Sequence, residues 1–135
     1  MQTQNRQPIQ NVELIEVKIK STATTRFGFP INADLKGKKV SAIEVIAVAD
    51  TTKTPLGDAV LNATAQKKGY LTLNANGKEK VKNLPLSSLI ASNNNGLVKE
   101  FDNILIDFDK SYISFSETTG LVADEVVLLA VYFQD

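Results

Sequence analysis

The 135-residue chain contains no cysteine, no histidine and no tryptophan, and it has a single methionine. Without histidine and cysteine it has no Ser-His-Asp triad, no imidazole base and no thiol nucleophile. The same absences exclude ordinary zinc, iron–sulfur and copper sites and thiol redox chemistry. We therefore predict a protein that is not an enzyme, with no catalytic residue, no metal and no cofactor. Chemistry by lysine or carboxylate side chains is the enzymatic alternative.

Charge of one sign is not in excess, because basic and acidic side chains number 15 each. The composition therefore gives no strong signal for nucleic acid. The two signs are unevenly distributed, however: residues 1–82 carry 13 basic and 7 acidic side chains, and residues 83–135 carry 2 and 8. Either antiparallel strands interleave the halves and cancel the field, or complementary edges meet between subunits, where charge sets register.

Long apolar runs are also missing. The longest run, residues 126–133, has eight residues, whereas a membrane helix needs about 20. The first 11 residues contain no apolar core of the kind that a signal peptide has. We expect a soluble protein with no membrane segment and no signal peptide.

β-Branched residues are abundant: valine, isoleucine and threonine make up 33 of the 135 residues. They favour strands, and apolar residues alternate with polar ones in 26–32 and 104–108, which is typical of half-buried strands. No stretch sustains a helical period. We predict an all-β, antiparallel two-sheet β-sandwich, with a jelly roll preferred and another Greek-key sandwich second. The predicted strands are 12–20, 26–32, 39–49, 59–65, 69–75, 78–83, 97–108, 111–116 and 124–134.

Two local signals refine this prediction. Asn76-Gly77 separates two strand-like runs, and this pair is the strongest signal for a two-residue hairpin turn. Residues 84–90 are the only helical candidate, with Pro85 suited to a first helical position. We predict a tight hairpin at the first site and at most two helical turns at the second.

The first and last strands are irregular in pattern. Residues 12–19 contain apolar residues in both strand phases, which predicts a bulge near Leu14. Residues 125–133 are apolar on both faces. Either this last strand is central with its outer face covered within the chain, or that face meets another subunit.

The domain organisation is simple. We predict one β-sandwich domain, residues 12–135, and a flexible N-terminal arm, residues 1–11. Besides Met1 the arm has one large aliphatic residue, Ile9, too little apolar surface to offset about 1–2 kcal/mol of backbone entropy per residue. The arm is either a plain tail or a segment that adds to a sheet edge of a neighbouring subunit.

Three kinds of polar group are candidate binding surfaces. An acidic cluster suits a hard cation, but no calcium-loop pattern is present, so a solvated strand face is preferred. Two lysine groups can contact phosphates, but aromatic residues are not interleaved with them, so edge protection or solvation is preferred. Tyrosines can line a sugar platform, although rim or core positions are preferred. The groups are Glu100, Asp102, Asp107 and Asp109; Lys36, Lys38 and Lys39; Lys78, Lys80 and Lys82; and Tyr70, Tyr112 and Tyr132.

Four segments follow one another in a characteristic order: 70–73 before a polar turn, 83–89, 106–113, and a closing apolar strand ending at 133. In this order of parts, over residues 26–134, the chain resembles small single-domain jelly-roll virion proteins of bacteriophages, particularly those of Bacteroidetes-type hosts. The resemblance implies a structural role in a capsid or its decoration, within a symmetric oligomer. It transfers no active-site residue.

The expected function is therefore that of a non-enzymatic structural protein of a phage particle, a capsid, vertex or capsid-associated protein that self-assembles. Its expected location is the virion, and its expected partners are copies of itself and other virion proteins. The alternative is a carbohydrate-binding or adhesin-type β-sandwich module, whose partner is a glycan. Oligomeric mass and glycan binding distinguish the two.

Overall fold

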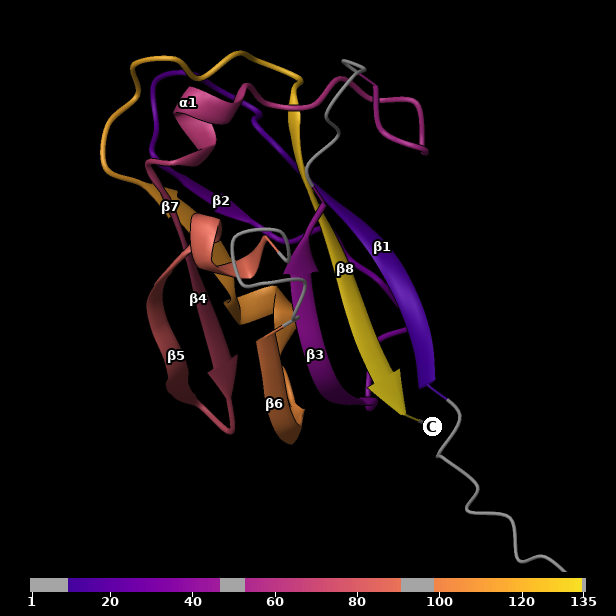
Figure 1. Cartoon of the computed structure of the whole chain (residues 1–135). Helices are drawn as coiled ribbons and strands as arrows, with labels where there is room; N and C mark the ends of the chain where they lie inside the picture. Colours follow the sequence, from indigo (N-terminus) through magenta and orange to yellow (C-terminus); the bar gives the residue numbers. More distant parts are fainter. Residues whose placement is uncertain (1–9, 47–52, 91–98, 135) are drawn as a thin grey trace, which may run out of the picture.

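The structure is a computed structural model that describes residues 10–46, 53–90 and 99–134. These residues form two four-stranded sheets whose apolar faces pack against each other (Figure 1). The strands are β1 (Gln10–Lys18), β2 (Arg26–Gly28), β3 (Lys39–Val45), β4 (Gly69–Ala75), β5 (Lys78–Pro85), β6 (Lys99–Leu105), β7 (Tyr112–Phe115) and β8 (Val126–Gln134). Sheet A has the order β1-β8-β3-β6, and sheet B has the order β2-β7-β4-β5. The predicted all-β, two-sheet sandwich is confirmed.

The strands pair as the two arms of one long ribbon. β4 pairs with β5, β3 with β6, β2 with β7, and β1 with β8, each pair being antiparallel. Successive pairs along the ribbon belong alternately to sheet B and to sheet A. In addition, β3 pairs with β8 within sheet A, and β4 pairs with β7 within sheet B. Strands from the two ends of the chain therefore lie side by side, and β8 must be in place for sheet A to close.

The turn at the tip of this ribbon joins β4 to β5. Asn76 and Gly77 both have positive φ, 54° and 75°, and Ala75 pairs with Lys78 across them. Two consecutive positive φ angles are those of a type I′ turn, whose twist matches that of the flanking strands. The hairpin predicted from Asn76-Gly77 is confirmed.

The inner faces of the two sheets supply the core. Val17, Ile43 and Leu129 of sheet A and Leu71 and Ile113 of sheet B are completely buried there. Burying each such side chain contributes about 1.5–3 kcal/mol. Alternate residues of these strands face outward, which explains the period-two pattern in the sequence.

β8 is buried on both faces within this single chain. Val127, Leu129 and Val131 point into the core, while Val126 and Leu128 on the other face have no exposed surface either. β8 lies between β1 and β3. Of the two interpretations of this strand, the covered central strand is therefore the one that the structure supports.

The strand predicted at 59–65 is wrong. Ala59 and Val60 make only isolated bridges, and the chain then enters the short helix α1 (Ala63–Gln66). Asn62 begins this helix, because its side-chain Oδ1 accepts a hydrogen bond from the Ala65 N–H at 2.8 Å. A side-chain cap of this kind favours a helix start over strand continuation.

The strand predicted at 26–32 is too long. β2 ends at Gly28, and Pro30, two residues later, has no N–H to donate to a neighbouring strand. Ile31 does not face the core as its alternation with Phe27 and Phe29 suggested; it is 99% exposed.

The bulge predicted near Leu14 is also wrong. The pairing of β1 with β8 runs without a shift from Gln10–Gln134 to Lys18–Val126. Leu14 lies opposite Ala130, on an outer face of sheet A that is itself apolar. Both phases of β1 therefore carry apolar residues without any extra residue in the strand.

The predicted N-terminal arm falls largely outside the described residues, since residues 1–9 are not among them. β1 begins at Gln10, two residues before the predicted start of the domain, and Asn11 pairs with Phe133. The helical prediction for 84–90 is confirmed as one 3₁₀ turn, η1 (Leu86–Leu89). Across the described residues, no helix has the length and apolar character needed to cross a membrane.

Candidate functional site

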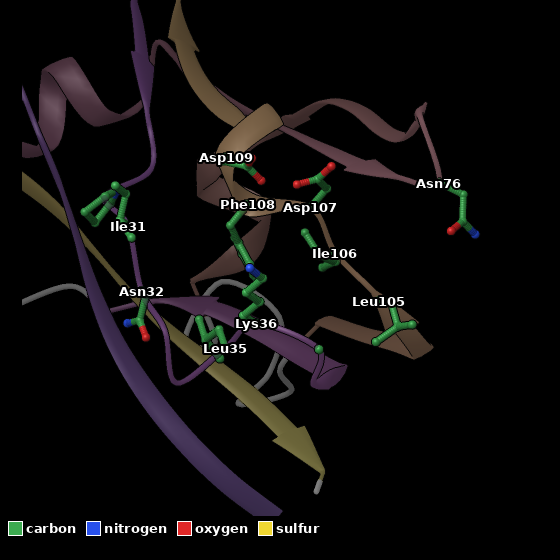
Figure 2. Close-up of a pocket in the computed structure, with 12 residues that line it drawn as sticks. Ile31, Asn32, Leu35, Lys36, Asn76, Leu105, Ile106, Asp107, Phe108 and Asp109 are labelled. Carbon is green, nitrogen blue, oxygen red and sulfur yellow. The ribbon is translucent and has the colours of Figure 1, made fainter.

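A pocket of about 590 Å³ lies at the end of the sandwich where β6 ends and β3 begins (Figure 2). Two segments form its walls: residues 30–37, between β2 and β3, and residues 105–109, which begin at the last residue of β6. We call it the end pocket. Its lining consists of Pro30, Ile31, Asn32, Leu35, Lys36, Gly37, Asn76, Leu105, Ile106, Asp107, Phe108 and Asp109.

Local hydrogen bonds shape the 30–37 wall. The Asn32 side chain accepts a hydrogen bond from the Asp34 N–H at 3.0 Å, and the Leu35 N–H donates to the Asn32 carbonyl at 3.3 Å. This turn buries Leu35 in the core and leaves Lys36 exposed. Gly37, with φ of 77°, then reverses the chain into β3.

The 105–109 wall is fastened to sheet B. The Asp107 N–H donates to the Asn74 carbonyl at 2.8 Å, and the buried Ser111 hydroxyl donates to the Asp107 carbonyl at 2.8 Å. The 3₁₀ turn η3 (Phe108–Lys110) follows, and the Phe108 ring lies 5.2 Å from that of Phe29. These contacts hold Asp107 and Phe108 in fixed positions at the pocket.

Two carboxyl groups give this wall its charge. A side-chain hydrogen bond to Asp109 raises the pKa of Asp107, and the same hydrogen bond lowers the pKa of Asp109. Lys110 lies beside the pair, with its Nζ 3.7 Å from Asp107 Oδ2. Asp109 also experiences the positive charge of Lys36 from the opposite wall. The charged side chains that line the pocket therefore have opposite signs on the two walls, Lys36 on one and Asp107 and Asp109 on the other.

The end pocket is suited to binding an apolar group beside polar ones. Leu35 and Ile106 are buried beneath it and Phe108 is half-buried, while Ile31 and Leu105 stand exposed on opposite sides of it (Figure 2). An apolar cavity with a few convergent polar groups is the usual form of a binding site. A partner's aliphatic side chain with a charged neighbour matches this lining.

The predicted acidic cluster is only partly brought together. Asp107 and Asp109 meet at the end pocket, at the start of η3 and not on the solvated strand face predicted for them. Glu100 lies opposite Ala42, toward the other end of β6 from Leu105. The side chain of Asp102 lies outside the described residues. In the described part of the chain, no group of three or more such side chains could hold a metal ion.

The two lysine groups lie at different places. Lys36 lines the end pocket, whereas Lys38 and Lys39 continue past it into β3. The second group occupies β5, which is the edge strand of sheet B. Its members Lys78, Lys80 and Lys82 are all exposed. An edge strand with three exposed lysines resists pairing with another edge.

The three tyrosines are divided between the sheets. Tyr70 and Tyr112 lie on the outer face of sheet B, where Tyr70 pairs with Ser114. Arg26 covers the Tyr112 ring, its guanidinium carbon 4.0 Å from the ring centroid. Tyr132 lies on sheet A and donates to Glu44 Oε1 at 2.6 Å, a bond that raises the Tyr132 pKa to about 12.

A shallow depression accompanies Tyr70 on sheet B. It measures about 270 Å³ and is lined by Tyr70, Asn83, Ser114, Phe115 and Ser116. An aromatic ring beside an amide and hydroxyl groups is the chemistry that recognises a sugar ring. Two of the three tyrosines thus share one face, but Tyr132 does not belong to it.

A second polar cluster fastens the 53–61 segment to sheet A. The buried Thr54 hydroxyl donates to Glu16 Oε2 at 2.8 Å, and Lys18 lies 4.0 Å from Asp58. Burial raises the pKa of Glu16, and a hydrogen bond to Asp58 acts in the same direction. Each polar group here has a neighbour within the chain, so the cluster is a structural fastening.

Sequence reasoning missed Ile31 and Leu105 as exposed side chains at a binding surface. Both were assigned to half-buried strands. Pro30 was the available signal for Ile31, because a proline ends strand pairing on its N–H side. Nothing comparable in the sequence marks Leu105 as the last residue of β6.

Comparisons of the chain with protein-family models, with curated proteins and with solved structures found no match.

Proposed function

We propose that the chain is a jelly-roll structural protein of a phage particle, a capsid, vertex or capsid-associated protein that assembles with copies of itself and with other virion proteins. The observation that carries the proposal is the ribbon pairing of the strands. Strand pairs β1–β8, β2–β7, β3–β6 and β4–β5, alternating between two sheets, are the order expected of a jelly roll. Viral capsid domains are among the proteins built on this fold.

The distribution of burial also supports a building-block role. β8 is covered on both faces by its own chain, so each copy is expected to fold before it assembles. The proposal assigns no catalytic residue, in keeping with the lack of histidine and cysteine. Saturable turnover of a glycoside, ester or phosphoester, lost on replacing one carboxylate or lysine, would contradict this part.

The test is the mass of the purified full chain over a range of concentrations, combined with electron microscopy. A defined symmetric oligomer or regular particles are expected. A monomer at every concentration, with no particles, would contradict the proposal.

A carbohydrate-binding module is the second candidate, and the depression beside Tyr70 favours it. On a glycan array, this candidate predicts a reproducible hit that Tyr70→Ala abolishes and Tyr70→Phe retains, because the ring supplies the stacking surface. Tyr132→Phe, on the other sheet, is the control and should bind as the parent chain does. A monomeric mass together with such a hit would replace the first proposal by the second.

A further inference from the structure

We propose that the end pocket receives Ile31 of a second copy of this chain, in a two-fold symmetric contact in which each copy supplies one projecting side chain and one pocket. The inference rests on the proposed self-assembly and names the surface that carries it. In a two-fold contact the same patch is used by both subunits, so it must be complementary to itself. The end pocket meets that requirement in shape and in charge.

Ile31 is the projecting element. It is 99% exposed, more than any other large hydrophobic residue in the described part of the chain. Pro30 before it has a fixed φ, and the hydrogen-bonded turn from Asn32 to Asp34 follows it. A single exposed aliphatic side chain is ordinary. This one is held at the rim of an apolar cavity, which gives a second copy a place to bury it.

The cavity offers a matching acceptor. Leu35, Ile106 and Phe108 provide an apolar surface, and the half-exposed Leu105 extends it on the side opposite Ile31 (Figure 2). Its volume of about 590 Å³ lies within the range of about 300–1,000 Å³ typical of ligand pockets. An isoleucine side chain with its flanking backbone therefore has room to enter.

The charges on the two walls favour the same arrangement. Lys36 stands on the 30–37 wall, and Asp107 and Asp109 stand on the 105–109 wall. In a two-fold contact, the 30–37 wall of each copy lies on the 105–109 wall of the other. Lys36 of each copy then faces Asp109 of the other, so the contact contains two such charge pairs. These residues come from the basic and acidic parts of the chain, and the zero net charge sets up no long-range repulsion between copies.

The first experiment compares the dimerisation constants of full-length variants by sedimentation equilibrium. Ile31→Asp places a charge in the apolar pocket, and we expect dimerisation to weaken at least about tenfold. Leu56→Asp is the matched control. Leu56 is 55% exposed and belongs to the segment fastened to β1 by Thr54, so its replacement should leave dimerisation unchanged.

The second experiment exchanges the charges. Lys36→Glu and Asp109→Lys each place like charges opposite each other in a homodimer, so each variant alone should dimerise weakly. An equimolar mixture should restore a heterodimer, because both reciprocal pairs are then of opposite sign. Both side chains are exposed, so their interactions with each other and with Asp107 inside one chain contribute little to its stability. Circular dichroism and thermal unfolding of the single variants should therefore stay close to those of the parent chain.

The outcomes separate this inference from the proposed function. A parent chain that stays monomeric at every concentration contradicts both. A parent chain that assembles while Ile31→Asp assembles equally well leaves self-assembly standing and overturns this surface. A third outcome is that deletion of residues 1–9 abolishes assembly while Ile31→Asp still assembles. That outcome overturns Ile31 as the occupant of the end pocket and favours the N-terminal segment in its place.

Discussion

Replacing Gly77 by valine tests the hairpin on which the strand ribbon depends. Gly77 has φ of 75° in the turn between β4 and β5. A Cβ built at this position meets no heavy atom within 4 Å, so the cost of a side chain comes from the backbone alone. The left-handed region costs an L-residue roughly 1–2 kcal/mol, and a β-branched residue lies at the upper end. We expect Gly77→Val to lower the free energy of unfolding by about 2 kcal/mol.

The assay is equilibrium urea unfolding followed by circular dichroism. With a slope of about 1–3 kcal/mol per molar urea, the loss corresponds to a midpoint lower by about 1 M. Gly77→Asn is the matched control, because asparagine enters the left-handed region more readily, and it should lose less than half as much. An unchanged midpoint for Gly77→Val, or equal losses for both variants, would refute the assignment of the cost to positive φ.

Three further substitutions probe other parts of the structure. Gly69→Ala puts a Cβ 2.5 Å from Leu86 Cδ1, so overpacking should cost about 1–3 kcal/mol; an unchanged melting temperature would contradict this. Leu128→Ala should cost about 2–5 kcal/mol in the monomer, as for a core leucine, whereas a loss below about 1 kcal/mol would mean that this face is open. The hydrogen bond to Glu44 raises the Tyr132 pKa to about 12 from its ordinary value of 10.0, so this stabilisation is complete below pH 10 and is lost as the pH rises through 12. Titration of phenolate absorbance should therefore show a component near pH 12 that is missing from Tyr132→Phe. A parent chain without that component would contradict the hydrogen bond.

Features fixed by local chemistry were predictable from the sequence. Asn76-Gly77 specifies its turn because both residues accept positive φ. The alternation in β4 and the uninterrupted apolar run of β8 reflect burial on one face and on both faces. In each case neighbouring residues carry the signal, although for β8 they did not show what covers its outer face.

Features fixed by contacts between distant segments were not predictable in the same way. The end pocket joins residues 30–37 to residues 105–109, and only the pairing of β3 with β6 brings them together. The alternation of apolar and polar residues predicted a strand that included Ile31, because alternation does not show where strand pairing ends. Asn62 shows the converse: a helix cap overrode the strand-like pattern that surrounds it.

The two candidate binding surfaces lie at opposite ends of β4, and this separation makes them independently testable. Tyr70, near the start of β4, belongs to the depression on sheet B, whereas Asn76, just after its end, lines the end pocket. Six residues of strand at about 3.3 Å each separate them by roughly 20 Å. The two linings also have no residue in common, and substitutions at separated sites with no shared partners usually act additively. In a chain that both dimerises and binds a glycan, Ile31→Asp alone should therefore weaken dimerisation and leave glycan binding unchanged, and Tyr70→Ala alone should do the reverse. Loss of glycan binding in Ile31→Asp would instead mean that glycan binding requires the assembled form.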